Sequence, residues 1–276
     1  MAWHARLALH YERQGLRTVA RHHHEGPLRI LRSLYPEGDA ICHNVLVHPP
    51  SGLVGGDTLD IDITLDAGTH GLVTTPGATR FYRTDDAAAV QRTQVRVADG
   101  ARLEWLPLEA LCYSGCRAEN HLTLSLAPGA QAIGWDVVAL GLPAAERPFE
   151  TGSLLQHLEI AGVWLERAQI AADDARLMDG PLGLAGQRCI ATLFLGAGSP
   201  LAPALREQAL ELAREVIEAH PLRAQAGATA PDPAVVVVRV LAPVVEPALH
   251  LLKAVRSAWR HALWGLAANP PRTWAL

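Results

Sequence analysis

The chain has 276 residues, of which 49% are apolar and 19% are charged, and its formal net charge is −4. This balance allows a large core and excludes a typical nucleic-acid-binding protein, which carries a basic excess. Four scattered cysteines exclude a disulfide framework. No apolar run has the length of a membrane span, and the N-terminus lacks the apolar core of a signal peptide. We therefore expect a soluble cytoplasmic protein that binds neither membrane nor nucleic acid.

Strand patterns dominate the first two thirds of the chain. Residues 3–20 alternate loosely between apolar and polar, and residues 42–47 are interpreted as a short strand. The run from Leu59 to Leu65 alternates strictly, with apolar side chains at every second position. A period of two is typical of a strand that buries one face.

Four segments share the order strand, glycine turn, strand. Their turn glycines are Gly68, Gly100, Gly129 and Gly162. We interpret each segment as a hairpin-like pair, which must stack on neighbours to bury its apolar face. Paired sheets and a helical ladder of strands both satisfy this requirement. A parallel α/β sheet does not, because no segment with a helical period lies between the strands.

The period changes after Gly196. Residues 201–220 and 246–268 each carry an apolar stripe with helical spacing, and the strongly apolar run 234–241 lies between them. The pattern predicts a mainly β fold with stacked or paired sheets, or a β-helix-like ladder of strands, followed by two C-terminal α-helices.

The same pattern predicts one domain over residues 1–276. Its β-rich body covers residues 1–195, and a strand plus two helices cover residues 196–276.

No complete catalytic or nucleotide-binding motif is present. The chain lacks G-x-x-x-x-G-K-[ST], H-E-x-x-H, a paired C-x-x-C and G-x-S-x-G. A hydrolase would have to use Asp57 with His48, yet no third group in the sequence is placed to orient the histidine. The residues alone leave three classes open, namely a metallochaperone or assembly scaffold, such an enzyme, and a plain structural adaptor. The not-enzyme interpretation rests on the family resemblance described below.

Three acids stand in or beside apolar strands, where a carboxylate is costly unless it is paired. They are Asp57, Asp136 and Glu166. They could accept local backbone N–H bonds, as an aspartate after a glycine turn often does. Alternatively, their oxygens could line a polar passage for a divalent cation, to which Thr79 would add a hydroxyl.

Two groups of basic and aromatic residues are candidates for a partner interface, where arginine and aromatic side chains are enriched. The first is Arg80 with Tyr82, and the second is Arg256 and Arg260 with Trp274. The alternatives are edge-strand packing for the first group and an intramolecular cover for the second.

Several motifs occur in an order that resembles one family. HPPSGLVGGD at 48–57 and TTPGATRFYR at 74–83 resemble the signature of the UreD (UreH) urease accessory proteins. GPLRI and LYPEG precede them, and LEWLP, GWDVVALG and the terminal PPRTWAL follow. The resemblance therefore covers almost the whole chain. Ser51 stands where the family usually has glycine, and Arg80 where it usually has lysine.

The resemblance implies a metallochaperone or scaffold required for nickel insertion into apo-urease. The implied partners are a UreF-like helical protein, a UreG-like GTPase and the urease subunits. No cofactor is expected to bind tightly, although nickel could pass transiently along Asp57, Thr79, Asp136 and Glu166. The alternative is a purely structural adaptor that bridges urease and the other accessory proteins without touching nickel.

Overall fold

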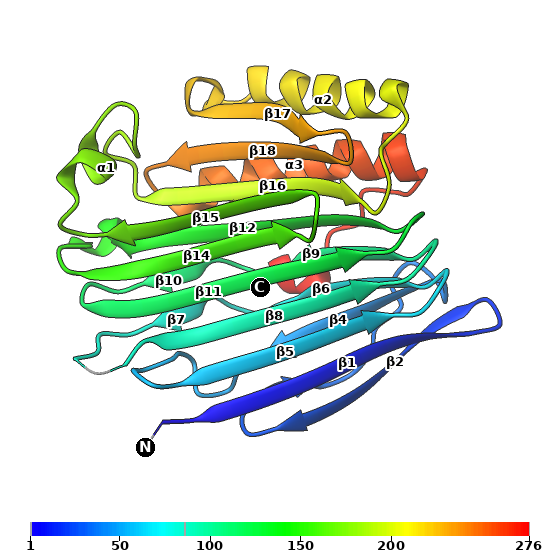
Figure 1. Ribbon diagram of the computed structural model, residues 1–276, viewed down its shortest axis with the longest axis horizontal. Coiled ribbons are helices and arrows are strands. Elements are labelled where there is room, and N and C mark those ends of the chain that lie inside the picture. The colour runs from blue at the N-terminus through cyan, green and yellow to red at the C-terminus, as the bar shows by residue number, and fades with distance from the viewer. Residues whose placement is uncertain (1, 86, 276) are drawn as a thin grey trace.

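The computed structural model describes residues 2–85 and 87–275, which form two stacked β-sheets with two helices on one outer face (Figure 1). Sheet A has the strand order β15-β14-β11-β8-β5-β1-β2. Its strands are β1 (His4–Gln14), β2 (Arg17–Glu25), β5 (Thr58–Leu65), β8 (Ala89–Val97), β11 (Cys116–Leu126), β14 (Gly152–Ile160) and β15 (Trp164–Ala171).

Sheet B has the order β17-β18-β16-β12-β9-β6-β4-β3, with β7, β10 and β13 attached beside it. Its strands are β3 (Arg29–Ile30), β4 (Ile41–Val47), β6 (His70–Thr74), β7 (Thr79–Phe81), β9 (Arg102–Leu106), β10 (Ala110–Cys112), β12 (Gln131–Leu142), β13 (Arg147–Pro148), β16 (Cys189–Ala197), β17 (Ala226–Asp232) and β18 (Val235–Ala242). The helices are α1 (Ala175–Asp179), α2 (Pro203–Glu218) and α3 (Val245–Trp264).

The middle of the chain winds as a ladder of parallel strands. In sheet A, β5, β8, β11 and β14 pair in parallel, and in sheet B so do β4, β6, β9 and β12. This confirms the predicted mainly β fold, and the two arrangements that the sequence allowed occur together, because the ladder of strands forms two stacked sheets.

The glycine turns act differently from the prediction. Gly68, Gly100 and Gly129 lie in turns that carry the chain from sheet A to sheet B, so these segments are corners of successive coils. Only the turn at Gly162 closes a true hairpin, between the antiparallel strands β14 and β15. All four have φ between 65° and 81°, a conformation that glycine adopts without strain.

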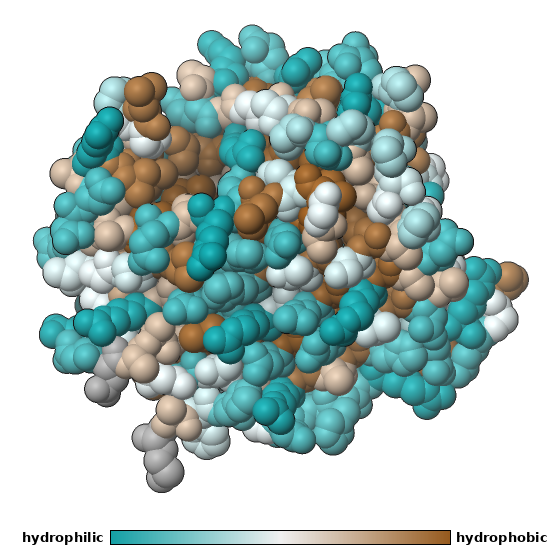
Figure 2. Space-filling model, viewed as in Figure 1, coloured by the Kyte–Doolittle hydropathy of each residue, from teal (hydrophilic) through white to brown (hydrophobic). Residues whose placement is uncertain are grey.

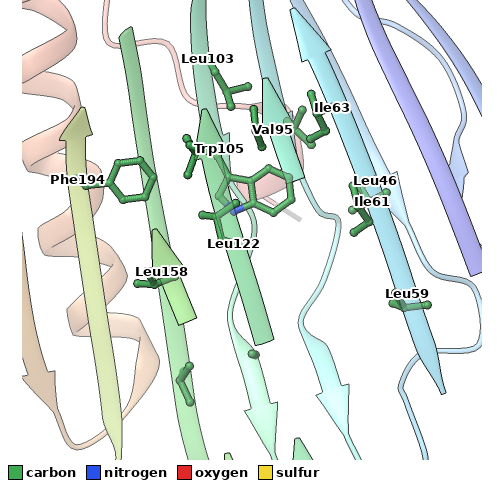
Figure 3. Close-up of a cluster of buried hydrophobic side chains, with 14 of the residues drawn as sticks. Leu46, Leu59, Ile61, Ile63, Val95, Leu103, Trp105, Leu122, Leu158 and Phe194 are labelled. Carbon is green, nitrogen blue, oxygen red and sulfur yellow. The ribbon is translucent and has the colours of Figure 1, made fainter. Parts of the chain in front are cut away.

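The space between the sheets is filled by the alternate side chains of each strand. On β5, Leu59, Ile61, Ile63 and Leu65 are buried, as the period of two predicts. They point toward apolar residues of the opposite sheet, including Leu103 and Trp105 of β9 (Figure 3). The intervening positions carry polar side chains, and hydrophilic residues gather over β5 and β8 on the outer face (Figure 2).

A second core lies between sheet B and the helices α2 and α3. Both helices were predicted at almost these positions. Helix α3 ends at Trp264 because Gly265 takes a left-handed conformation, with φ of 65°, and caps the preceding turn. Trp259 of α3 donates its indole N–H to the carbonyl oxygen of Ala209 in α2 at 2.8 Å, which ties the two helices together. No helix in the described ranges is both long and apolar enough to cross a membrane.

Two elements were not predicted. The edge strand β17 adds a second strand to the segment expected to contain one, and its sequence AGATAPD lacks the large apolar residues that mark a strand. Pro231 is tolerated there because only one side of an edge strand is paired. Helix α1 is a short turn begun by Asp174, whose carboxylate accepts the backbone N–H of Leu177.

Removing residues 246–276 should abolish solubility, because it uncovers the apolar outer face of sheet B, including Trp135, Leu193 and Val238. We also expect the shortened chain to lose capture of a helical accessory partner. Soluble yield and pull-down measure the two effects. A soluble truncated chain that still captures the partner would show that α3 covers nothing essential.

Candidate functional site

A row of polar side chains crosses the otherwise apolar space between the sheets. The parallel register of sheet A places Leu59, Gln91, Asn120 and Gln156 at one level on β5, β8, β11 and β14. All four belong to the inward-facing rows of their strands. Gln91 Nε2 donates to Asn120 Oδ1 at 3.2 Å, so the first two amides are linked. Three stacked strands thus present amides, instead of aliphatic side chains, to sheet B.

Asp136 of β12 faces this amide row from sheet B. Its Oδ1 accepts a hydrogen bond from Asn120 Nδ2 at 2.7 Å, and its Oδ2 accepts one from Gln156 Nε2. The residue is 6% exposed. The carboxylate is therefore held between two neutral donors, which satisfy it without neutralising its charge.

The polar line continues in sheet B and ends at an acid–arginine pair. Thr192 and Arg239 lie level with Asp136 on the neighbouring strands β16 and β18. Glu166 of β15 accepts a hydrogen bond from Thr192 Oγ1 at 3.2 Å and one from Arg239 Nε at 2.7 Å. About half of the Arg239 side chain is exposed, so this end of the line reaches solvent.

A small cavity beside Asp136 shares two lining residues with an open pocket on the surface. The cavity has a volume of about 20 Å³, enough for roughly one water molecule, and Thr79, Gln91, Asn120 and Asp136 are among its lining residues. Thr79 and Gln91 also line an open pocket of about 250 Å³. These two residues therefore border both the surface pocket and the cavity beside the buried carboxylate.

The pKa of Asp136 is raised to about 6, mainly by burial and also by the charge of Glu166, while the hydrogen bonds from Gln156 and Asn120 act against the rise. An ordinary aspartate titrates near pH 3.9. The folded protein therefore holds a proton that the unfolded chain has released. Stability must fall as the pH rises through this window, and the loss is complete above it.

Replacing Asp136 by asparagine should remove that loss. We expect the variant to gain up to about 3 kcal/mol of unfolding free energy near neutral pH, and nothing near pH 4. The gain reaches this limit only if the side-chain amide of Gln156 flips, so that its oxygen accepts a hydrogen bond from the amide introduced at position 136. Denaturant unfolding at the two pH values measures the difference. Asp62→Asn, on the exposed face of β5, is the control. An equal effect at both pH values would contradict the raised pKa.

Asp57, by contrast, is satisfied by backbone groups. Its Oδ1 accepts the N–H of Trp3 at 2.7 Å and its Oδ2 accepts the N–H of Val54 at 2.9 Å. These bonds fix the turn before β5 and join it to the N-terminal segment. This arrangement matches the first of the two interpretations offered by the sequence, in which an aspartate after a glycine turn accepts local N–H bonds.

Asp57→Ala should therefore destabilise the fold, because two part-buried N–H groups lose their acceptor. The expected cost is about 1–3 kcal/mol of unfolding free energy. Asp62→Ala, five residues along and exposed, should stay within about 0.5 kcal/mol of wild type. Equal denaturation midpoints for the two variants would show that the Asp57 bonds contribute nothing.

The first predicted interface pair lies beside the surface pocket. Arg80 lines the pocket, while the Tyr82 ring packs against Tyr113 with ring centroids 5.0 Å apart. Tyr82 also explains a nearby glycine: a Cβ atom on Gly52 would lie 2.4 Å from its ring. Both residues are half-buried, so each presents only part of its side chain to a partner.

The second predicted pair is buried, which differs from the expected surface position. Arg256 and Arg260 are 1% and 0% exposed and lie between α3 and sheet B. Arg256 Nε donates to Glu104 Oε2 at 2.8 Å, and Arg260 Nε donates to Glu104 Oε1 at 3.0 Å. Arg260 also pairs with Glu37 at 2.7 Å. The two guanidinium groups thus form the intramolecular cover that the sequence left as an alternative.

Trp274 anchors the C-terminal segment to the same face of sheet B. Its indole N–H donates to Thr74 Oγ1 at 3.1 Å, and its ring lies 5.2 Å from the ring of Trp135. The Lys253 ammonium and the Arg256 guanidinium lie over the Trp274 ring at 4.9 and 5.5 Å. The residue is partly buried, so its contacts here are largely internal.

The sequence analysis missed the amides Gln91, Asn120 and Gln156 and the buried acid Glu104. The amides each interrupt an apolar row of period two, and that interruption is a readable signal. Glu104 gives no such signal, because its partners lie more than 150 residues away. Among residues 2–85 and 87–275, no three His, Cys, Asp or Glu side chains are grouped so that they could hold a metal ion. Any metal contact along the polar line would therefore use isolated carboxylate, hydroxyl and amide oxygens.

Comparison with known proteins agrees with the sequence motifs. The family described as UreD urease accessory protein matches residues 4–275. Proteins named urease accessory protein UreD from a Polaromonas species, Paracidovorax citrulli and Variovorax paradoxus are 65%, 66% and 64% identical, and each alignment covers 100% of both chains. The chain therefore belongs to the UreD family of urease accessory proteins.

Proposed function

We propose that this chain acts in urease maturation as a non-catalytic accessory protein that brings nickel to apo-urease through an internal polar passage. Its relatives are named urease accessory proteins. In this proposal it works in the cytoplasm, in a complex with a UreF-like helical protein and a UreG-like GTPase, which supplies the nucleotide chemistry. Nickel is cargo that passes through, and no cofactor stays bound.

One observation carries the passage: Thr79 and Gln91 line both the open pocket and the narrow cavity that ends at Asp136. From there the polar line runs through Thr192 to Glu166 of β15 and its partner Arg239 of β18, which is about half exposed. The proposed route thus crosses the protein between the two sheets, from the mouth of the pocket to the Glu166–Arg239 pair.

The chemistry of the line suits transient handling of a hard divalent cation. Carboxylate, hydroxyl and amide oxygens bind such ions less tightly than a cluster of thiolates and imidazoles would. The cavity holds roughly one water molecule, so a cation must shed most of its hydration shell to pass. Asp136 would replace part of that shell, and its charge lowers the cost of entering a dry interior.

A structural adaptor remains the second candidate, and the hydrogen bonds favour it. Both oxygens of Asp57 and of Asp136 already have donors, and Glu166 already has Arg239. In that case the polar line would only fix the stacking of the two sheets, and nickel would reach urease by another way.

The test is the nickel content of urease purified from cells that express its subunits and the other accessory proteins, with and without this chain. We expect nickel near one full complement per active site with the chain and little without it. Equal nickel in both preparations would end the maturation role. Replacing the carboxylates of the polar line then distinguishes a nickel passage from a structural adaptor.

A further inference from the structure

The open pocket next to Thr79 has the chemistry of an anion site. It lies between the sheets, with a floor of Leu28, Leu46 and Leu59 and a volume of about 250 Å³. His48, Thr79 and Arg80 supply polar groups to its lining. Among residues 2–85 and 87–275, no carboxylate lines it. The nearest acid that acts on His48 is Asp57, whose two oxygens already accept backbone N–H bonds.

Arg80 is the charged group of the pocket, and it lacks a partner. Its Nε is buried without a hydrogen-bond acceptor, and within the described part of the chain its guanidinium makes no ion pair or hydrogen bond. A buried guanidinium N–H that is left unsatisfied is costly, because the group has lost its water and gained nothing in return. This points to an acceptor that binds in the pocket.

We propose that this pocket binds a carboxylate group attached to a short aliphatic chain, with Arg80 as its cationic partner. A carboxylate matches the planar fork of a guanidinium and can accept two parallel N–H bonds. Thr79 adds a hydroxyl donor at the rim, and the three leucines receive the aliphatic part. The inference holds whether or not nickel passes beyond the pocket.

Butyrate is a suitable probe, with butyramide as its neutral counterpart of the same shape. We expect the wild-type protein to bind butyrate saturably at constant ionic strength and to bind butyramide at least tenfold more weakly. Arg80→Gln should weaken butyrate binding about tenfold or more. The matched control is Arg83→Gln, three residues along and well exposed, which should bind like wild type. No nickel or urease is needed, so a failure here leaves the maturation role untouched.

A second measurement does not depend on any variant folding. The ¹⁵Nε–H signal of Arg80 in wild-type protein should shift as butyrate is added, since Nε gains an acceptor. An unchanged signal, equal binding of butyramide, or wild-type affinity in a folded Arg80→Gln variant would each overturn the proposal.

The same experiment can distinguish two possible sources of the carboxylate, a partner protein and a free small acid. If the carboxylate belongs to an acidic side chain of a partner, excess butyrate should release that partner from the wild-type protein. Butyrate should release the partner equally well from the control variant Arg83→Gln. If it belongs to a free small acid, butyrate should bind with no effect on assembly. Both results support the site and differ only in its natural ligand.

Discussion

Replacing Glu104 by alanine is expected to lower the free energy of unfolding by about 3–5 kcal/mol, because it leaves the buried Arg256 without a carboxylate and Arg260 with Glu37 alone. Glu104 is completely buried, and both its oxygens accept from Arg256 and Arg260, while His70 Nε2 lies 3.2 Å from Oε1. Although burial alone would raise the pKa of Glu104, these neighbours hold it far below its usual range. The carboxylate is therefore ionised at neutral and mildly acidic pH.

Denaturant unfolding followed by tryptophan fluorescence measures this loss, with soluble yield as a second readout. Glu207→Ala, on the exposed face of α2, should change stability by no more than about 0.5 kcal/mol. A double variant, Glu104→Leu with Arg256→Leu, should cost less than Glu104→Ala, since it removes a charge of each sign and leaves the pair of Arg260 with Glu37. A single variant as stable as wild type would mean that the cluster is not a structural centre.

The sequence contains much of the fold because its strands have one buried face. The alternation from Leu59 to Leu65 corresponds to the inward row of β5, and the helical stripes correspond to α2 and α3. The pairing of the strands, by contrast, could not be predicted from the sequence. A glycine turn between two strands looks the same whether the chain returns within one sheet or crosses to another. Only contacts between distant coils decide that, and they separate the turn at Gly162 from the turn at Gly100.

The candidate site could be predicted from the sequence to the same degree. Asp136 could be selected because a carboxylate inside an apolar strand is unusual. Its donors could not be assigned, because Asn120 and Gln156 become neighbours of Asp136 only when three coils are stacked in register. The buried position of Arg256 and Arg260 could not be predicted for a related reason. A basic helix face looks like a surface until an acid more than 150 residues away is placed beneath it.

A buried acid that lowers stability at neutral pH is more typical of a functional position than of a structural one. Leucine or methionine at position 136 would satisfy the packing of β12 without requiring amides from two strands of sheet A. Glu104 contrasts with it, because its charge is balanced by direct ion pairs. The two buried acids of sheet B thus face opposite sides and serve different purposes: one stabilises the helical cover, and the other faces the route between the sheets.

The double variant Asp136→Asn with Glu166→Gln is expected to lower nickel per urease active site while leaving complex assembly intact. The changes keep the shape of both side chains and remove the two negative charges along the line between the sheets. A loss of about 1.4 kcal/mol of cation stabilisation at one carboxylate slows transit about tenfold. Each single variant should therefore show a partial loss, and the double variant a larger one, because the ion must pass both positions.

Nickel is counted on urease purified from cells that carry the chain and its partners, and pull-down of the partners reports assembly. The matched control is Asp62→Asn with Glu25→Gln, which removes the same charge from exposed positions of sheet A and should load nickel normally. The Asp136 change should also stabilise the chain near neutral pH, so poor folding cannot explain a loss of nickel. Full nickel loading by the double variant would remove the passage and leave this protein a scaffold, because no cation crosses a dry interior at the same rate after both of its carboxylates are neutralised.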